Sequence, residues 1–294
     1  YTGHVRWSGW VVGIALLSLG GGLAYLHATG RDEALREKVE RMLVDAQPSD
    51  PSEWPGPAAL LQEPVVTFPE GFGVFRVVVD PGHGAKGNTG NLSSFCQDEQ
   101  DFTMALGEEL AKHLRGTGHF DAELSRQGEA LVPYPDRVSS SEQWEAHVFL
   151  SLHSDVRGQM QVWDPDGGQQ CPRSEVAPGF SVLWSDDGEQ GTRRRTLART
   201  LATNMARAGF LAYPGEEYEL YEGDEVVPGV FLDRHPPGKR IYVLHKPKMP
   251  SVIVETHNAW DPREARRWKE ADARRVFFQV VTASLVAFLS TPEK

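Results

Sequence analysis

From Arg76 onward, apolar runs of strand length alternate with longer amphipathic segments, and no other feature limits the possible folds as strongly. The apolar runs predict strands over residues 76–80, 121–125, 147–152, 180–184, 241–244 and 251–255. The amphipathic segments predict helices over residues 99–114, 136–145, 193–208 and 262–289. Strands that alternate with helices usually form a parallel sheet between helical layers. We therefore predict an α/β fold with a mostly parallel, twisted sheet and helices on both faces.

Two further parts precede this α/β segment. Residues 31–46 are rich in charge and place Leu35, Val39 and Leu43 four positions apart, which predicts a helix. The prolines and serines that follow indicate a linker. The predicted organisation is an apolar N-terminal segment over residues 1–30, a helix and Pro-rich linker over 31–64, and one globular domain over 65–294.

The apolar segment WVVGIALLSLGGGLAYL, residues 10–26, carries no charge. As a helix it would be about 25 Å long, near the lower limit for crossing a bilayer. Trp7 and Tyr25 lie near its ends, where membrane interfaces favour aromatic residues. A cleaved signal peptide is less favoured, because Leu26 and His27 occupy positions where cleavage sites need small residues. We expect a transmembrane anchor, ahead of a cleaved signal and of a buried soluble helix.

The charges around this segment do not favour export of the part that follows it. Arg6 lies before the segment, and four basic residues lie after it: Arg31, Arg36, Lys38 and Arg41. Basic residues usually stay on the cytoplasmic side of a membrane segment. Taken alone, this count would keep the globular domain in the cytoplasm.

Composition argues against a general nucleic-acid-binding protein but does not decide whether the two cysteines form a disulfide. The formal net charge is −11, whereas a general nucleic-acid-binding protein needs a basic surface. Cys96 and Cys171 show neither CxxC nor Cys/His zinc-finger spacing. They are either two unrelated thiols or one disulfide, and a disulfide becomes the better interpretation if the domain is exported.

Chemically active residues follow three of the predicted strands. In open parallel sheets, ligands bind just beyond the carboxyl ends of the strands. The strand RVVVD leads to His83, the strand HVFLSL leads to His153, and the strand SVIV leads to Glu255. Glu99 begins the first helix and follows the loop that starts at His83, so it can lie at the same edge. We therefore expect these four side chains to converge.

The glycines around His83 raise the alternative of a phosphate-binding loop. The P-loop motif requires G-x-x-x-x-G-K-[ST]. Counting from Gly82 places the second glycine correctly at Gly87, but Asn88 stands where lysine is required. The group that would reach the phosphates is missing, which excludes this interpretation.

A metal site explains the residues better. Two histidines and a glutamate form an established catalytic zinc set that leaves a fourth position for water. His83, Glu99 and His153 can supply this set, and Glu255 can be the base that takes a proton from the water. Single histidines near strands are more often structural, so it is their convergence that favours a ligand role.

Two further histidines can support such a site. His257 lies two residues after Glu255, and His245 follows the apolar run IYVL. Either can be a group behind the ligands or a substrate contact, and His257 is the stronger candidate.

Five stretches, in order, resemble the zinc-dependent N-acetylmuramoyl-L-alanine amidases, the family with the DPGHG signature. They are VVVDPGHG, DEQDFTMALGEELAKHL, LSRQGEALVPYPDRV, VFLSLHSD and KMPSVIVETHNAWDP. The resemblance spans about residues 76–289. Each stretch alone is weak evidence, but their order and family-like spacing are strong evidence.

The resemblance implies roles for individual residues. His83, Glu99 and His153 match the ligands of one Zn²⁺ ion, and Glu255 matches the catalytic glutamate. Arg126 lies within a matching stretch and Asn88 in the loop just after the DPGHG motif, and each can support the ligands or contact substrate. The implied reaction is hydrolysis of the amide between N-acetylmuramic acid and L-alanine in peptidoglycan, during wall remodelling or division.

The resemblance also implies a location. Such enzymes work outside the cytoplasm, so we expect a periplasmic or extracytoplasmic domain anchored through residues 10–26, against the charge count. An exported domain favours a disulfide between Cys96 and Cys171, which would tie the long 156–179 loop to the metal edge. The 209–239 segment is rich in Gly, Pro, Glu and Tyr and could cover the site.

The sequence departs from the family at several points. AKGNTG follows the DPGHG motif, Ser154 and Asp155 replace the usual Ala-Asn, and THNAWD follows the strand SVIV. No ligand or base is lost, but stem-peptide preference stays open, as does any regulatory protein partner. Two alternatives also stay open: an amidohydrolase for another N-acyl amino acid or peptide amide, and an inactive regulatory module.

Overall fold

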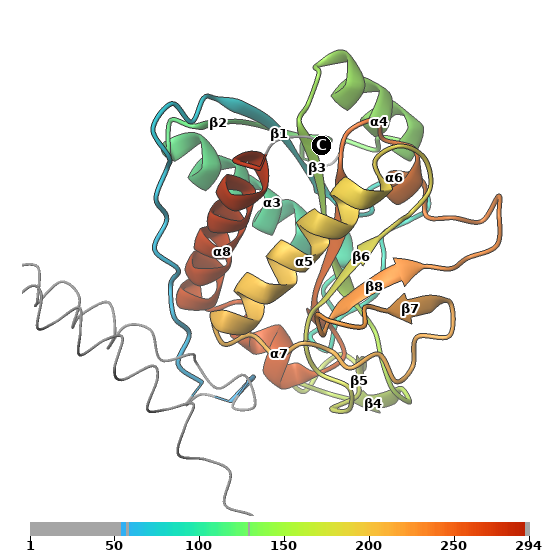
Figure 1. Cartoon of the computed structure of the whole chain (residues 1–294). Coiled ribbons are helices and arrows are strands. Elements are labelled where there is room, and N and C mark those ends of the chain that lie inside the picture. Colours follow the sequence, from blue (N-terminus) through green and yellow to red (C-terminus); the bar gives the residue numbers. More distant parts are fainter. Residues whose placement is uncertain (1–53, 57–58, 129, 292–294) are drawn as a thin grey trace, which may run out of the picture. The chain divides into compact units, whose positions relative to one another are not determined.

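The computed structural model describes residues 54–56, 59–128 and 130–291 (Figure 1). The predicted apolar segment over 10–26 and the predicted helix over 31–46 lie outside these residues. Within the described part of the chain, no helix is both long enough and apolar enough to span a membrane.

A seven-stranded sheet forms the centre of the α/β body, in the order β2-β1-β3-β9-β6-β8-β7. Four neighbouring pairs are parallel, while β6 is antiparallel to β9 and β7 to β8. The mostly parallel sheet predicted from the sequence is therefore confirmed. The strands are β1 (Phe75–Pro81), β2 (Phe120–Leu124), β3 (Val148–Asp155), β6 (Ser181–Trp184), β7 (Tyr221–Gly223), β8 (Val230–Asp233) and β9 (Ser251–Asn258).

Helices cover both faces of the sheet (Figure 1). The helices are α3 (Glu99–Gly116), α4 (Tyr134–Gln143), α5 (Gly191–Arg207), α6 (Tyr242–His245), α7 (Pro262–Arg267) and α8 (Ala271–Leu289). Val77 and Val79 of β1 belong to the core beneath α3, α5 and α8, while Val78 belongs to the core beneath α4 and α6. This alternation follows from the two-residue period of a strand.

Two predicted elements were wrong in type or extent. Residues 241–244, predicted as a strand, form the short helix α6 over Tyr242–His245, and Val243 and Leu244 are buried in it. A short apolar run has no periodicity that separates a strand from a buried helix. The predicted helix over 262–289 is broken into α7 and α8, because Trp268 ends α7 and enters the core.

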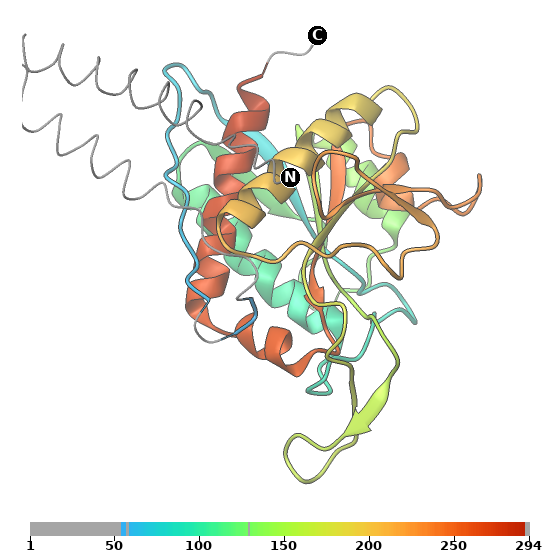
Figure 2. The same cartoon turned by 60° about the horizontal axis from the view of Figure 1, so that its bottom comes forward.

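Four short strands were not predicted. β4 (Gln161–Trp163) and β5 (Cys171–Arg173) pair as an antiparallel hairpin in the long segment after β3. In Figure 2 this light-green hairpin extends away from the sheet. β7 and β8 lie within the 209–239 segment, so part of that segment is sheet rather than loop.

The segment ahead of residue 65 packs against the α/β body. The Trp54 side chain is 4% exposed, and its ring centroid lies 5.0 Å from that of Phe210 and 6.3 Å from that of Trp268. Its Nε1 donates a 2.6 Å hydrogen bond to Oε1 of Glu264. Part of the predicted linker therefore contributes to the core.

Replacing Trp54 with alanine should lower the free energy of unfolding by about 3–5 kcal/mol, because a large buried ring and its hydrogen bond are lost. Denaturant unfolding followed by circular dichroism measures this change. Leu60→Ala is the matched control, since Leu60 is 79% exposed in the same segment. Equal stability of the two variants would contradict the docking of Trp54.

Candidate active site

The turn after β1 holds His83 in an unusual backbone conformation. His83 has φ of 61° and Gly84 has φ of 65°. A Cβ atom on Gly82 would lie 2.4 Å from Cε1 of His153, so only glycine leaves room for that ring. The glycines therefore bring the rings of His83 and His153 together rather than binding phosphate.

A buried ion pair between Asp80 and Arg137 stabilises this turn. Oδ1 of Asp80 accepts a 3.0 Å hydrogen bond from Nη1 of Arg137, and both side chains are fully buried. Oδ2 of Asp80 accepts a 2.5 Å bond from the hydroxyl of Ser151 on β3. Arg137 also donates to the carbonyl oxygens of Pro81, at 3.0 Å, and of His83. The pair thus provides hydrogen-bond donors for the backbone carbonyl oxygens of the turn that carries His83.

Arg126 connects the same turn to α3. It is 4% exposed and does not line the cavity described below. Its Nε donates to the carbonyl oxygen of Pro81 at 2.9 Å, and its Nη2 donates to that of Gln100 at 2.7 Å. This position agrees with the supporting role that the sequence left open for Arg126.

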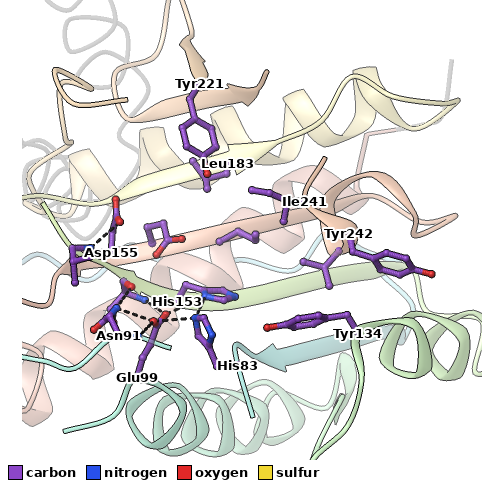
Figure 3. A pocket seen from close by; sticks show the side chains of 15 residues that line it. His83, Asn91, Glu99, Tyr134, His153, Asp155, Leu183, Tyr221, Ile241 and Tyr242 are labelled. Carbon is purple, nitrogen blue, oxygen red and sulfur yellow. Dashed lines mark hydrogen bonds and ion pairs between the residues drawn. The ribbon is translucent and has the colours of Figure 1, made fainter. Parts of the chain in front are cut away.

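Three predicted ligands meet at the carboxyl edge of the sheet (Figure 3). Nε2 of His83 lies 2.9 Å from Oε2 of Glu99, and Nδ1 of His153 lies 3.0 Å from Oε1 of Glu99. The two ring nitrogens are 3.1 Å apart. Each residue can offer one ligand atom to a single metal ion.

The hydrogen bonds behind His83 leave the nitrogen that faces Glu99 and His153 free to bind a cation. Nδ1 of His83 lies 2.7 Å from Oδ1 of Asn88, and the backbone N–H of Gly90 donates to that same oxygen at 3.3 Å. His83 therefore carries its proton on Nδ1 and has a lone pair on Nε2. Histidine ligands are oriented in this way by an acceptor behind the ring. Facing acceptor atoms about 3 Å apart repel unless they share a cation, so the donor set fits a metal.

Glu99 is held in its ionised form. The Asn91 side chain donates to Oε2 of Glu99 at 2.7 Å, and the backbone N–H of Ser154 donates to Oε1 at 2.9 Å. Burial alone would raise the pKa of Glu99, but the imidazoles of His153 and His83 beside its carboxylate hold this pKa well below its ordinary value. An ionised carboxylate is the form that binds a metal.

Glu255 faces the triad from β9, where it pairs with His153 of β3. Its Oε2 is buried and has no hydrogen-bond partner among the described residues. Burial, followed by the nearby carboxylates of Asp155 and Glu99, raises the pKa of Glu255 well above its ordinary value. A carboxyl group without a partner beside a metal triad is suited to accept and return a proton.

These residues line one cavity of about 410 Å³. The 209–239 segment reaches it through Tyr221, as Figure 3 shows. Besides the triad and Glu255, the lining consists of Asn91, Tyr134, Ser154, Asp155, Val156, Leu183, Tyr221, Ile241, Tyr242, Val243 and Ile253.

Among the cavity residues that were not predicted from the sequence are Asn91, Tyr134 and Tyr221. Asn91 stands next to the AKGNTG stretch, whose departure from the family was the only available signal. Tyr134 and Tyr221 reach the cavity because α4 and β7 pack beside it. Such packing cannot be predicted from a local sequence pattern.

His257 lies behind the site rather than in it. Its ring is 3% exposed and is 5.0 Å from the ring of Phe102 and 5.8 Å from that of Trp268. The Thr256 hydroxyl lies 2.8 Å from Nδ1 of His257 and donates to the carbonyl oxygen of His153 at 2.9 Å. His257 therefore has no direct access to substrate and supports His153 indirectly. His245 lies on α6, where its Nδ1 is 2.9 Å from the carbonyl oxygen of Ile241.

The expected disulfide is present. Cys96 and Cys171 are bonded across 75 residues of sequence. The bond joins β5 of the hairpin to the loop that leads into Glu99. The long segment after β3 is thereby tied to the metal edge, as the sequence predicted.

An α/β sheet that gathers a His-Glu-His triad and a free glutamate at its carboxyl edge defines a hydrolase-type site with a candidate metal centre. The family profile described as N-acetylmuramoyl-L-alanine amidase (Amidase_3) matches residues 77–286. This chain belongs to the N-acetylmuramoyl-L-alanine amidase family of hydrolases.

Individual relatives agree with the family assignment. The amidase AmiA of Escherichia coli K12 is 24% identical over 233 residues, which cover 72% of this chain and 75% of AmiA. A probable amidase AmiB of Haemophilus influenzae is 25% identical over 231 residues, or 73% of this chain and 52% of AmiB. The chain thus spans only about half the length of the latter.

A solved structure agrees with the fold. The amidase Ami1 of Mycobacterium smegmatis superposes with a TM-score of 0.59 at 20% identity, covering 75% of this chain and 99% of Ami1. At this level of identity, the agreement concerns the arrangement of the sheet and helices.

The buried His257 should make the fold sensitive to acid. Burial lowers the pKa of His257 to about 3, against an ordinary value of 6.5. Below about pH 6.5, His257 is therefore protonated in the unfolded chain but stays neutral in the folded chain. The free energy of unfolding falls as the pH drops. In His257→Phe this contribution is absent, so between about pH 7.5 and 4.5 the variant should lose about 2–3 kcal/mol less than the wild type. Denaturant unfolding at both pH values measures the difference, and parallel losses in the two proteins would refute it.

Proposed function

We propose that this chain is a zinc-dependent amidase that hydrolyses the bond between the lactyl group of N-acetylmuramic acid and L-alanine in peptidoglycan. The observation that carries the proposal is the His83–Glu99–His153 triad facing the unpaired carboxyl of Glu255 in one cavity. Family membership supports the choice of bond.

Zinc is the metal that this donor set favours. Two imidazoles and one carboxylate match the ligands of catalytic zinc sites, whereas Mg²⁺ and Ca²⁺ prefer oxygen ligands alone. His83, Glu99 and His153 would hold the ion, with Asn88 orienting His83 and Asn91 orienting Glu99. When bound, zinc lowers the pKa of water and polarises the substrate carbonyl.

Glu255 is the residue that moves the proton. Its carboxylate takes a proton from the attacking water and passes it to the leaving nitrogen of L-alanine, so that the amine departs neutral. The position of Glu255 directly opposite His153 supports this role, since the water and the nitrogen must both be within its reach.

We further propose an extracytoplasmic location, with catalysis assigned to residues 65–294 and anchoring to residues 10–26. The Cys96–Cys171 disulfide supports an oxidising compartment. One relative, from Staphylococcus aureus, is described as a probable cell wall amidase.

Removing the metal should abolish hydrolysis reversibly. Release of peptide from purified sacculi, followed by mass spectrometry, should stop after treatment with a strong zinc chelator and dialysis. Added Zn²⁺ should restore it, and added Mg²⁺ should not. Full activity in protein shown by metal analysis to contain no zinc would disprove the zinc mechanism.

Glu255→Gln should lower the rate of peptide release by about 10²–10⁴-fold, because the amide cannot accept the proton. Zinc content should be unchanged, since Glu255 is not part of the triad. Glu123→Gln is the control, because Glu123 is exposed on the edge strand β2. Wild-type activity in the Glu255 variant would remove this residue from the mechanism.

A further inference from the structure

The cavity has two sides of different chemistry (Figure 3). The triad, Asp155 and Glu255 make one side polar and acidic. The apolar side chains of Leu183, Ile241, Val243 and Ile253 also line the cavity, and Figure 3 shows Ile241 on the side away from Asp155 and Glu99, which we call the apolar side. Tyr134 lies below Tyr242 in Figure 3, with its hydroxyl end toward His83.

The Tyr134 hydroxyl is a hydrogen-bond donor without an acceptor among the described residues. Oδ1 of Asn88 faces two donors, the ring N–H of His83 and the backbone N–H of Gly90. The amide nitrogen of Asn88 must therefore point the other way, and it donates to the Tyr134 oxygen at 2.9 Å. Because the phenol oxygen accepts this bond, its own proton remains available to a molecule in the cavity.

The charges of the cavity restrict what can enter the apolar side. In the described part of the chain, no lysine or arginine lines the cavity, whereas three carboxylate residues do: Glu99, Asp155 and Glu255. The buried Arg157 is already bonded to Asp155 at 2.9 Å. The buried Arg137, whose guanidinium carbon lies 4.9 Å from the centroid of the Tyr134 ring, is bonded to Asp80 at 3.0 Å. A substrate carboxylate on the apolar side, away from the metal, would lose its hydration and find no lysine or arginine among the lining residues, which is unfavourable.

We propose that the apolar side of the cavity is the subsite for the sugar ring of the substrate, and that the Tyr134 hydroxyl donates a hydrogen bond to that sugar. This inference rests on the proposed amidase function and names the half of the substrate that the cavity selects. The stem peptide then leaves the metal in the other direction.

The chemistry of the two substrate halves supports this placement. On the sugar side of the scissile amide the lactyl carboxyl is consumed in the bond, so that half carries no charge. It offers hydroxyl and acetamido oxygens as acceptors for Tyr134, and ring C–H groups that pack against Ile241 and Ile253. The stem peptide, in contrast, carries free carboxylates that this cavity cannot pair.

The test compares two enzymes on two substrates. One substrate is an N-acetylmuramyl-L-alanyl peptide, and the other is the lactyl-L-alanyl peptide of the same sequence, which lacks only the sugar. Tyr134→Phe keeps the ring and removes the hydroxyl. We expect kcat/KM to fall about 10-fold further on the sugar-bearing substrate than on the other, the loss of one neutral hydrogen bond, because any loss through Asn88 is common to both substrates.

A binding measurement separates this inference from the proposed function. In the zinc-loaded Glu255→Gln variant, calorimetry gives the dissociation constant of each substrate without turnover. Adding Tyr134→Phe should weaken binding of the sugar-bearing substrate about 10-fold more than binding of the sugarless one. This result supports the subsite even if the wild-type enzyme prefers another scissile bond.

Two outcomes would overturn the subsite. Equal losses on both substrates, with a lower zinc affinity, would mean that Tyr134 acts only by holding Asn88 behind His83. A loss that depends on the length of the peptide rather than on the sugar would place the peptide on the apolar side.

Discussion

The parallel register of β1, β3 and β9 is the constraint on which the rest of the site depends. Pro81 pairs with Leu152, and His153 pairs with Glu255, so three strands deliver their chemical groups at one level. The turn is locked to this register by the backbone N–H of Gly82, which donates to the carbonyl oxygen of Leu152 at 2.9 Å. A slip of one residue would send the His153 side chain to the opposite face of the sheet. The triad therefore depends on strand pairing as well as on the glycine turn after β1.

Holding His83 in the left-handed region costs free energy, and buried polar groups offset that cost. A non-glycine residue in this conformation costs roughly 1–2 kcal/mol, as such residues at functional sites do. The Asp80–Arg137 pair and Arg126 return hydrogen bonds to the carbonyl oxygens of the turn. Removing one member of such a buried pair leaves the other charge buried without a partner. Either single removal should therefore destabilise the turn. The geometry of the metal edge thus depends on buried charges that do not line the cavity.

The sequence predicted correctly those features that depend on a local hydrophobic pattern. The apolar runs of β1, β3 and β9 and the polar residue after each were enough to bring His83, His153 and Glu255 together. The helix α6 could not be recognised, because four apolar residues are too few to show a period. The hairpin of β4 and β5 has three-residue strands, largely exposed in β4 and largely buried in β5, and strands this short carry no recognisable hydrophobic pattern. Asn88 could be excluded as a phosphate-loop residue, but its place behind His83 depends on the tertiary turn.

The end of β9 shows how distant segments stabilise the site. Glu264 accepts hydrogen bonds from the backbone N–H groups of Asn258, at 2.9 Å, and Gly179, at 3.1 Å, in addition to that from Trp54. Burial raises the pKa of Glu264 to about 7, while the bond from Trp54 and those from the backbone act in the opposite direction. One buried carboxyl therefore joins the segment ahead of the sheet, the end of the disulfide-tied loop and the strand that carries Glu255. Because these three segments share one acceptor, the position of the catalytic strand depends on all of them.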